Sequence, residues 1–289
     1  MKKTINLGRA EAVVDTLGGE LISYKLDGKE YVWCGDEKYW SGHAPMMFPF
    51  VSALKEQTVK YGGQPYSYAG KHGFARKSEF ELVSAGDGEA VMKLVPNGDI
   101  KKAYPYDFEV LTKHTITECG YTTEYTVTNT DKEPIQFCIG GHPAFAVDGS
   151  IEDYELIFEN EENSDLYYTD SLSLFAENYK IGKRIVGKKF GLCYDDYDID
   201  CLIAKDLVSR KVTLAKKADG SGITLDFRGF PVLVIWTPPK KKAPFLCLEP
   251  CCGIAAYTDE TGNFEDKPYR KVLLPGEKYT AAYSVTVNK

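Results

Sequence analysis

One glutamate and two histidines are the residues of this sequence best suited to chemistry. Glu249 ends an apolar run, residues 245–248, that predicts a buried strand. Alternation along a strand places Phe245, Cys247 and Glu249 on one face. A carboxylate on an apolar face must be paired, hydrogen-bonded or shifted in pKa, because an isolated charge there costs several kcal/mol. Glu249 therefore belongs either to a structural ion pair or to an acid–base site.

The two histidines of interest, among four in the chain, lie in short glycine-containing turns. His72 occurs in Lys-His-Gly-Phe-Ala-Arg, residues 71–76, and His142 in Gly-Gly-His-Pro-Ala-Phe, residues 140–145. A glycine beside a histidine lets the backbone approach a ligand closely. Each histidine taken alone is more simply explained as a structural residue. Two such turns together with an inward Glu249 indicate general acid–base chemistry.

Other catalytic schemes find less support. The sequence has no GxSxG nucleophile elbow, no GxxxxGK[ST] phosphate loop and no HExxH metal motif. Glycoside hydrolysis needs a second carboxylate, for which Asp200 is a candidate, although a surface aspartate at the start of a strand explains it equally well. Cys247, Cys251 and Cys252 fit no standard zinc spacing. We expect them to be buried small hydrophobic residues, and we expect no metal site.

The elements that must position these groups are predicted to be strands. Residues 121–129 alternate between polar and β-branched or aromatic types, and residues 232–236 form a short apolar run. Turn dipeptides separate such runs at Gly18-Gly19, Asp27-Gly28, Gly62-Gly63 and Asp87-Gly88. A weak helical pattern spans Ser164 to Tyr179. With no long linker, the whole chain, residues 1–289, is predicted to be a single large antiparallel β-domain.

Composition narrows the partners and the compartment. The 289 residues are 43% hydrophobic and 27% charged, with a net charge of -7 and a pI near 5.3. This acidic balance disfavours nucleic acid and anionic membranes as partners. No signal-peptide core and no run of 18 apolar residues is present, so we expect a cytoplasmic protein without a membrane span. Its eight cysteines are then expected to be reduced, without a disulfide.

An ordered set of short motifs resembles the aldose 1-epimerases, also called galactose mutarotases. The matching segments run over nearly the whole chain: residues 18–21, 48–49, 72–76, 129, 141–145, 235–237, 247–250, 253–255 and 274–277. The resemblance implies an all-β fold, a large twisted antiparallel β-sandwich with an open sugar-binding cleft. It also implies that no organic cofactor is needed. A small-molecule sugar is the expected partner, and a homodimer is possible.

The resemblance also assigns roles to individual residues. By motif match, Glu249 corresponds to the family's catalytic base, His142 to its catalytic acid and His72 to a second active-site histidine. Anomer interconversion removes a proton from the C1 hydroxyl while it protonates the ring oxygen, so a carboxylate and an imidazolium suffice. We expect the first two side chains to face one cleft, roughly 5 to 8 Å apart, to leave room for the sugar. The expected substrate contacts are Asp200, Arg76, Phe145 and Trp236.

Three positions depart from the pattern of this family. Ala53 stands where relatives carry an arginine that contacts the sugar or, in hexose-6-phosphate epimerases, its phosphate. Cys251 and Cys252 follow the Glu-Pro motif where an aromatic residue is usual, and Ala256 stands where an aspartate is common. With Ala53 lacking a guanidinium, we expect an unphosphorylated hexose or related sugar as substrate.

Two alternatives remain open at this point. Arg76 could grip a phosphate, which would make the protein a hexose-6-phosphate 1-epimerase. A non-catalytic carbohydrate-binding or sensory domain would keep the sandwich and lose turnover, because a fold does not by itself define a function.

Overall fold

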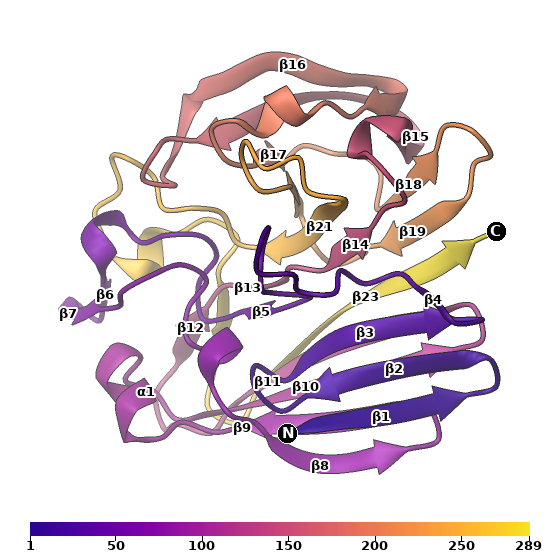
Figure 1. Ribbon diagram of the computed structural model, residues 1–289. Coiled ribbons are helices and arrows are strands. Elements are labelled where there is room, and N and C mark those ends of the chain that lie inside the picture. The colour runs from indigo at the N-terminus through magenta and orange to yellow at the C-terminus, as the bar shows by residue number, and fades with distance from the viewer.

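The computed structural model describes residues 1–289, except that the side chains of residues 176–182 lie outside the description. Strands with a few short helices form the regular elements of the chain, and each strand pair is antiparallel (Figure 1). One sheet has four strands in sequence order: β1 (Lys2–Leu7), β2 (Ala10–Asp15), β3 (Glu20–Leu26) and β4 (Lys29–Glu30). The predicted all-β class is confirmed.

A second sheet of fifteen strands forms the body of the molecule. Its main path runs β5-β13-β21-β20-β17-β15-β18-β19-β23-β11-β10-β9-β8, while β14 pairs with β21 and β16 with β15. Its strands are β5 (Met46–Met47), β8 (Glu81–Gly86), β9 (Glu89–Leu94), β10 (Phe108–Thr117), β11 (Gly120–Asn129), β13 (Ile139–Gly141), β14 (Ala144–Ala146), β15 (Tyr154–Thr169), β16 (Phe175–Gly191), β17 (Leu202–Ala204), β18 (Lys211–Lys216), β19 (Gly222–Asp226), β20 (Val232–Trp236), β21 (Phe245–Cys252) and β23 (Lys278–Asn288).

The remaining elements are short. Two-stranded sheets pair β6 (Thr58–Tyr61) with β7 (Gln64–Ser67) and β12 (Ile135–Phe137) with β22 (Lys271–Leu273). The helices are α1 (Gly98–Ala103), η1 (Lys55–Gln57), η2 (Ala75–Lys77), η3 (Ile151–Asp153), η4 (Tyr194–Tyr197) and η5 (Phe264–Asp266). None of the described helices is long and apolar enough to cross a membrane.

The two larger sheets pack face to face and enclose part of the core. Figure 1 shows β1 to β3 lying across β10 and β11. Buried and partly exposed residues alternate along β2 and β10, so each strand presents one apolar face. Tyr24 of β3 and Tyr121 of β11 meet across the interface with ring centroids 5.2 Å apart. This packing is the sandwich that the resemblance implied.

The helix predicted for Ser164 to Tyr179 is wrong. Ser164 lies within β15, which ends at Thr169, and β16 begins at Phe175. Two polar residues of this strand, Glu162 and Ser164, are buried, so the sequence lacks the apolar alternation of a strand. Glu162 compensates for its burial by accepting hydrogen bonds from two backbone N–H groups. The turn dipeptides, in contrast, all separate strands as predicted.

A close backbone contact fixes the turn that carries His72. Phe48 and Gly73 form an isolated bridge, and the Phe48 N–H donates to the His72 carbonyl oxygen at 3.1 Å. Gly73 has φ +70°, and a Cβ there would lie 2.0 Å from the Phe48 carbonyl oxygen. No side chain fits in that space, so glycine at position 73 holds the turn against the strand before it.

We expect Gly73→Ala to destabilise the protein more than Gly63→Ala. Gly63 also has a positive φ, +77°, but a Cβ there would meet no atom within 4 Å. Both substitutions incur the left-handed backbone penalty of about 1–2 kcal/mol, whereas only Gly73→Ala adds an overpacking cost of about 1–3 kcal/mol. Urea unfolding monitored by fluorescence measures both variants. Equal midpoints for the two would contradict the steric argument.

Candidate active site

The pairing of β21 with its neighbours places His142 opposite Glu249. Strands β13 and β14 both pair with the same edge of β21, in one register, with Gly140 opposite Cys251 and Ala144 opposite Cys247. His142 and Pro143 fill the gap between β13 and β14, where Pro143 has no N–H to continue the ladder. Counting from either pair brings His142 across from Glu249. Cross-strand neighbours of this kind hold their side chains in contact.

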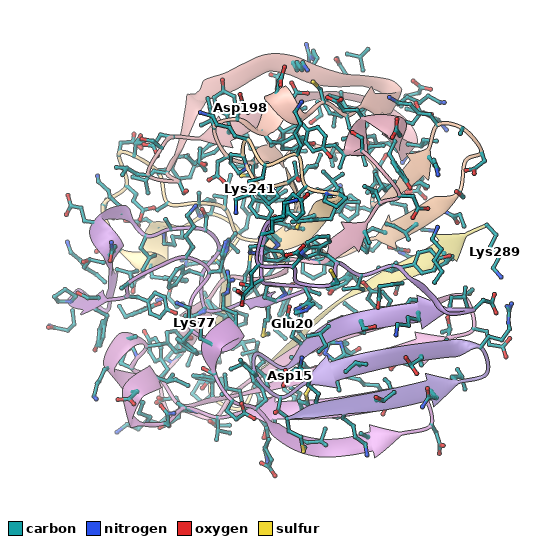
Figure 2. The ribbon with its side chains drawn as sticks, viewed as in Figure 1. Asp15, Glu20, Lys77, Asp198, Lys241 and Lys289 are labelled. Carbon is teal, nitrogen blue, oxygen red and sulfur yellow. The ribbon has the colours of Figure 1, made fainter. Side chains whose placement is uncertain are left out.

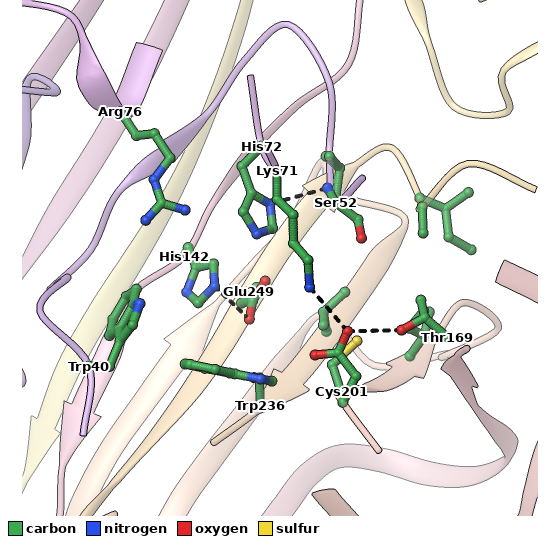
Figure 3. Close-up of a pocket in the computed structure, with 16 residues that line it drawn as sticks. Trp40, Ser52, Lys71, His72, Arg76, His142, Thr169, Cys201, Trp236 and Glu249 are labelled. Carbon is green, nitrogen blue, oxygen red and sulfur yellow. Dashed lines mark hydrogen bonds and ion pairs between the residues drawn. The ribbon is translucent and has the colours of Figure 1, made fainter. Parts of the chain in front are cut away.

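The two side chains meet directly at the floor of a cavity (Figure 3). His142 Nε2 lies 3.3 Å from Glu249 Oε1, and the side chains are only 7% and 3% exposed. Both line the same cavity, as expected from the sequence. The expected separation of roughly 5 to 8 Å is wrong, because it assumed that the sugar lies between the two groups. Cross-strand neighbours approach the cavity from the same side instead.

Burial disfavours charge on both members of this pair. Desolvation raises the pKa of Glu249 well above its ordinary value, an effect to which Asp200 adds. Desolvation lowers the pKa of His142 to about 3, with a further contribution from Arg76. A carboxylic acid beside a neutral imidazole and a carboxylate beside an imidazolium differ only in where one proton lies. The pair therefore carries a single exchangeable proton and no net charge at neutral pH.

His72 is held as a neutral donor. The Ser52 N–H donates to His72 Nδ1 at 3.1 Å, so the ring hydrogen is on Nε2. Burial lowers the pKa of His72 well below its ordinary value, and the neighbouring His142 lowers it further. The two imidazole rings are edge to face, with centroids 5.4 Å apart. His72 thus presents an N–H group beside the acid–base pair without adding a charge.

Two tryptophans enclose His142. The Trp40 ring stacks on the imidazole at 5.0 Å and 24°, and the Trp236 ring meets it edge to face at 5.5 Å and 79°. Both line the cavity (Figure 3). Their apolar rings exclude water from the imidazole and offer flat surfaces of the kind on which a pyranose ring stacks.

Asp200 lies at the other end of the cavity in a network of hydrogen bonds. Its Oδ2 accepts from the hydroxyls of Thr169, at 3.0 Å, and Ser173, at 2.9 Å. Lys71 Nζ lies 3.5 Å from the same oxygen. The charged groups that line the cavity apart from the acid–base pair are therefore one carboxylate and two cations, Lys71 and Arg76. Arg76 has no ion pair with any described side chain.

Six of the seven residues expected at the site line this cavity of about 200 Å³: Glu249, His142, His72, Asp200, Arg76 and Trp236. Phe145 does not. It is 1% exposed, pairs with Leu246 and packs in the main core. Strand alternation explains the difference, since Leu246 points away from the face that carries Cys247 and Glu249. The expected contact between Phe145 and the sugar therefore has no support in the structure.

The sequence did not single out several residues that line the cavity. Trp40 and Ser52 lie in loops without a recognisable motif, and Thr169 ends a strand that the sequence did not predict. Lys71 precedes His72, and its place in the same turn was the one available signal. The expected alternation of β21 is confirmed, because Cys247 packs beside Trp40 and Trp236 while Leu248 joins the main core.

A buried carboxylate holds the segment that follows Trp40. Glu20 Oε1 accepts hydrogen bonds from the N–H groups of His43, at 3.0 Å, and Ala44, at 2.5 Å. Figure 2 shows Glu20 at the inner end of β3, toward the middle of the molecule. Burial raises the pKa of Glu20 to about 6, although the two backbone donors and the charge of Arg76 oppose the shift.

The chain is similar to known proteins over nearly its whole length. The family model described as aldose 1-epimerase matches residues 2–286. Protein LacX of Lactococcus lactis subsp. lactis, in its chromosomal form, is 34% identical over 291 residues, covering 94% of each chain.

Two solved structures are also similar over nearly their full length. A galactose mutarotase related enzyme from Lactobacillus acidophilus has a TM-score of 0.93 and 26% identity, covering 100% of this chain and 98% of that one. A galactose mutarotase-like protein from Lactobacillus casei has a TM-score of 0.89 and 29% identity, covering 100% of both chains.

We expect Glu20→Gln to remove a pH-dependent loss of stability. The native carboxyl keeps its proton up to about pH 6, whereas the unfolded one loses it near 4.5. Its contribution is therefore fully present below pH 4.5 and falls by about 2 kcal/mol as the pH rises through 6. A glutamine oxygen can accept both N–H groups without a charge. The free energy of unfolding of Glu20→Gln relative to the wild type should rise by that amount between pH 4 and pH 7.

The control for this experiment is Glu37→Gln. Glu37 is exposed in the loop before Trp40, so its substitution should leave the pH dependence of stability unchanged. A Glu20→Gln protein with the wild-type pH dependence would show that Glu20 is not the buried titrating group. The measurement is urea unfolding at several pH values at constant ionic strength.

Proposed function

The chain belongs to the aldose 1-epimerase family, and we propose that it interconverts the α and β anomers of an unphosphorylated hexose or related sugar. The observation that carries this proposal is the buried contact between His142 and Glu249 in a cavity flanked by tryptophans. The reaction needs one proton removed and one donated, so a pair with a single mobile proton matches it.

The short distance between the two groups suits the geometry of the reaction. The C1 hydroxyl and the ring oxygen are bonded to the same carbon, so an acid and a base side by side can each reach one of them. We assign Glu249 as the base that takes the hydroxyl proton and His142 as the acid that protonates the ring oxygen. The C1–O5 bond breaks as the C1 carbonyl forms, and the open aldehyde rotates about C1–C2 before it recloses.

The resting pair and the pair that opens the ring differ by the transfer of one proton from Glu249 to His142. Ring opening begins with a carboxylate and an imidazolium and ends with a carboxylic acid and a neutral imidazole. Burial of His142 and Glu249 favours the second state, which is the one that the open aldehyde needs for ring closure. The enzyme's net charge is unchanged throughout, but the apolar surroundings oppose the carboxylate and imidazolium form from which ring opening starts.

The other polar groups of the cavity are suited to hold the sugar. His72 offers its Nε2–H, and Asp200 offers carboxylate oxygens already oriented by the Thr169 and Ser173 hydroxyls. Trp40 and Trp236 offer ring faces and edges for the C–H surface of the pyranose. Such contacts would fix the C1 hydroxyl near the acid–base pair, and holding reacting groups in place contributes much of a rate enhancement.

One observation favours a second candidate, a hexose-6-phosphate 1-epimerase. Ala53 and Lys71 form an isolated antiparallel bridge, so Lys71 lies beside the position where an arginine was expected and reaches into the cavity. The expectation of a neutral sugar rested on Arg76 as the one cation near the substrate. Lys71 is already paired with Asp200, however, which leaves Arg76 as the uncommitted positive charge for a dianion. We therefore keep the neutral sugar as the first proposal.

Replacing either member of the acid–base pair should abolish most of the turnover. We expect Glu249→Gln and His142→Gln each to lower kcat by about 10²- to 10⁴-fold, measured by polarimetry on freshly dissolved α-D-glucose and α-D-galactose. The double variant should lose little more than the worse single variant, because each transfer fails without its partner. Losses that multiply would mean that the two groups act independently. A wild type with no turnover that still binds sugar would be a binding domain.

The charge of the substrate is tested with glucose and glucose 6-phosphate at equal ionic strength. We expect kcat/KM to favour glucose by roughly ten- to hundredfold. One missing charged hydrogen bond leaves about 1.5–3 kcal/mol of the dianion's desolvation cost without compensation. A tenfold preference for the phosphate would establish the second candidate. In that case Lys71→Met should remove the preference, whereas Lys55→Met, which alters a lysine bonded to the Glu260 carbonyl outside the cavity, should not.

A further inference from the structure

Three different donor atoms meet where His142 and Glu249 line the cavity, with the Cys247 sulfur packed behind them. A ring nitrogen of His142, the Cys247 sulfur and a Glu249 oxygen all lie within 4.8 Å of one another, and all three residues are buried. We propose that these residues form a site for a borderline divalent transition metal such as Zn²⁺, which enters through the cavity and competes with the sugar. The metal is an inhibitor of the site and not a part of the reaction.

The strand geometry that builds the acid–base pair also supplies the third donor. Cys247 and Glu249 are two residues apart on β21, so their side chains share a face. Cys247 lies opposite Ala144, two residues from His142 on the paired chain. Local spacing does not indicate this site, because only Cys251 and Cys252 lie near Cys247 in the sequence and His142 comes from a distant segment.

The distances are close to those of a tetrahedral metal site. Zinc binds nitrogen, oxygen and sulfur at about 2.0–2.3 Å, which places two of its ligands about 3.3–3.6 Å apart. His142 Nε2 and Glu249 Oε1 are already 3.3 Å apart. The Cys247 sulfur, within 4.8 Å of both, has to approach by at most about an ångström. Three protein ligands would leave one coordination position for solvent or a small ligand.

Charge balance also permits a dication in this buried place. The metal would displace one proton from the Cys247 thiol and one from Glu249, so the complex is neutral like the resting pair. Lys71 and Arg76 line the same cavity, and their positive charges repel a metal cation. The loss of the Cys247 and Glu249 protons offsets this repulsion.

The surroundings of the site indicate reversible binding. A metal-bound histidine usually donates its second N–H to a carboxylate or carbonyl group, which strengthens the site. His142 Nδ1 is buried and has no hydrogen-bond partner among the described atoms. The site therefore lacks that support. We therefore expect moderate affinity.

Metal binding is tested directly, without reference to activity. The full-length reduced protein, freed of metal with a chelator, is titrated with Co²⁺. We expect one equivalent to bind with a near-ultraviolet thiolate-to-cobalt absorption, and Zn²⁺ to displace it. Cys247→Ser should lose the absorption. Cys251→Ser is the matched control, because Cys251 is equally buried on the same strand and face but lies outside the cluster, and it should keep the absorption.

The inhibition rests on the proposed function and is measured separately. Zn²⁺ should inhibit mutarotation competitively with the sugar. Its inhibition constant should be at least tenfold higher for Cys247→Ser than for the wild type, with each measured relative to that protein's own rate without zinc. Cobalt binding without the thiolate band, or a band that survives Cys247→Ser, would overturn the site. If the band is present but the protein has no mutarotase activity, the metal site stands and the proposed function fails.

Discussion

The register in which β21 pairs with β13 and β14 determines where the two proton-transfer groups lie. His142 is neither in a regular strand nor in a free loop: it spans the gap between two short strands that share one register. A slip of one residue would bring Leu248 opposite His142 and turn Glu249 to the other face. Glycines help to hold the register, since a Cβ on Gly141 would lie 2.6 Å from the Tyr283 ring.

Burial then determines the protonation of that pair. All eight residues of β21 are buried, and the same apolar surroundings that raise the pKa of Glu249 lower that of His142. Two opposite shifts leave one proton for two sites. An exposed pair at the same distance would be held as separate, hydrated charges and would not exchange a proton with an acetal as readily. The low polarity of the strand is thus part of the proposed chemistry.

Much of this site could be predicted from sequence, and the failures have identifiable causes. Local pattern alone indicated Glu249 on an apolar strand and His142 in a glycine-rich turn. The ordered set of family motifs then assigned the two residues to one site. Their separation was misjudged because sequence does not give the register between distant strands. Phe145 failed for the same reason, since its face follows from pairing with Leu246. The helix predicted from Ser164 failed because polar residues point inward there.

Lys71 and Trp40 show what a single motif cannot reveal. Lys71 enters the cavity beside Ala53 because the two chain segments are bridged. The structure therefore shows that a lysine from one segment lies next to the position where the arginine of the other segment is missing. Trp40 reaches His142 from a loop that depends on remote contacts: Trp33 Nε1 donates to its carbonyl oxygen at 2.8 Å, and Glu20 binds the segment after it. Such contacts leave no local pattern.

The polar groups of the site are retained at a cost to stability. A buried carboxyl beside a buried imidazole rarely stabilises a fold as well as apolar side chains of similar size, because desolvation offsets their attraction. Glu20, which holds the segment after Trp40, carries a similar cost. These costs fall on residues that a sandwich core does not need: the neighbours of Glu249 on β21 are apolar or thiol side chains. Keeping charge-bearing groups in and beside a fully buried strand is therefore better explained by the proposed chemistry than by the needs of the fold.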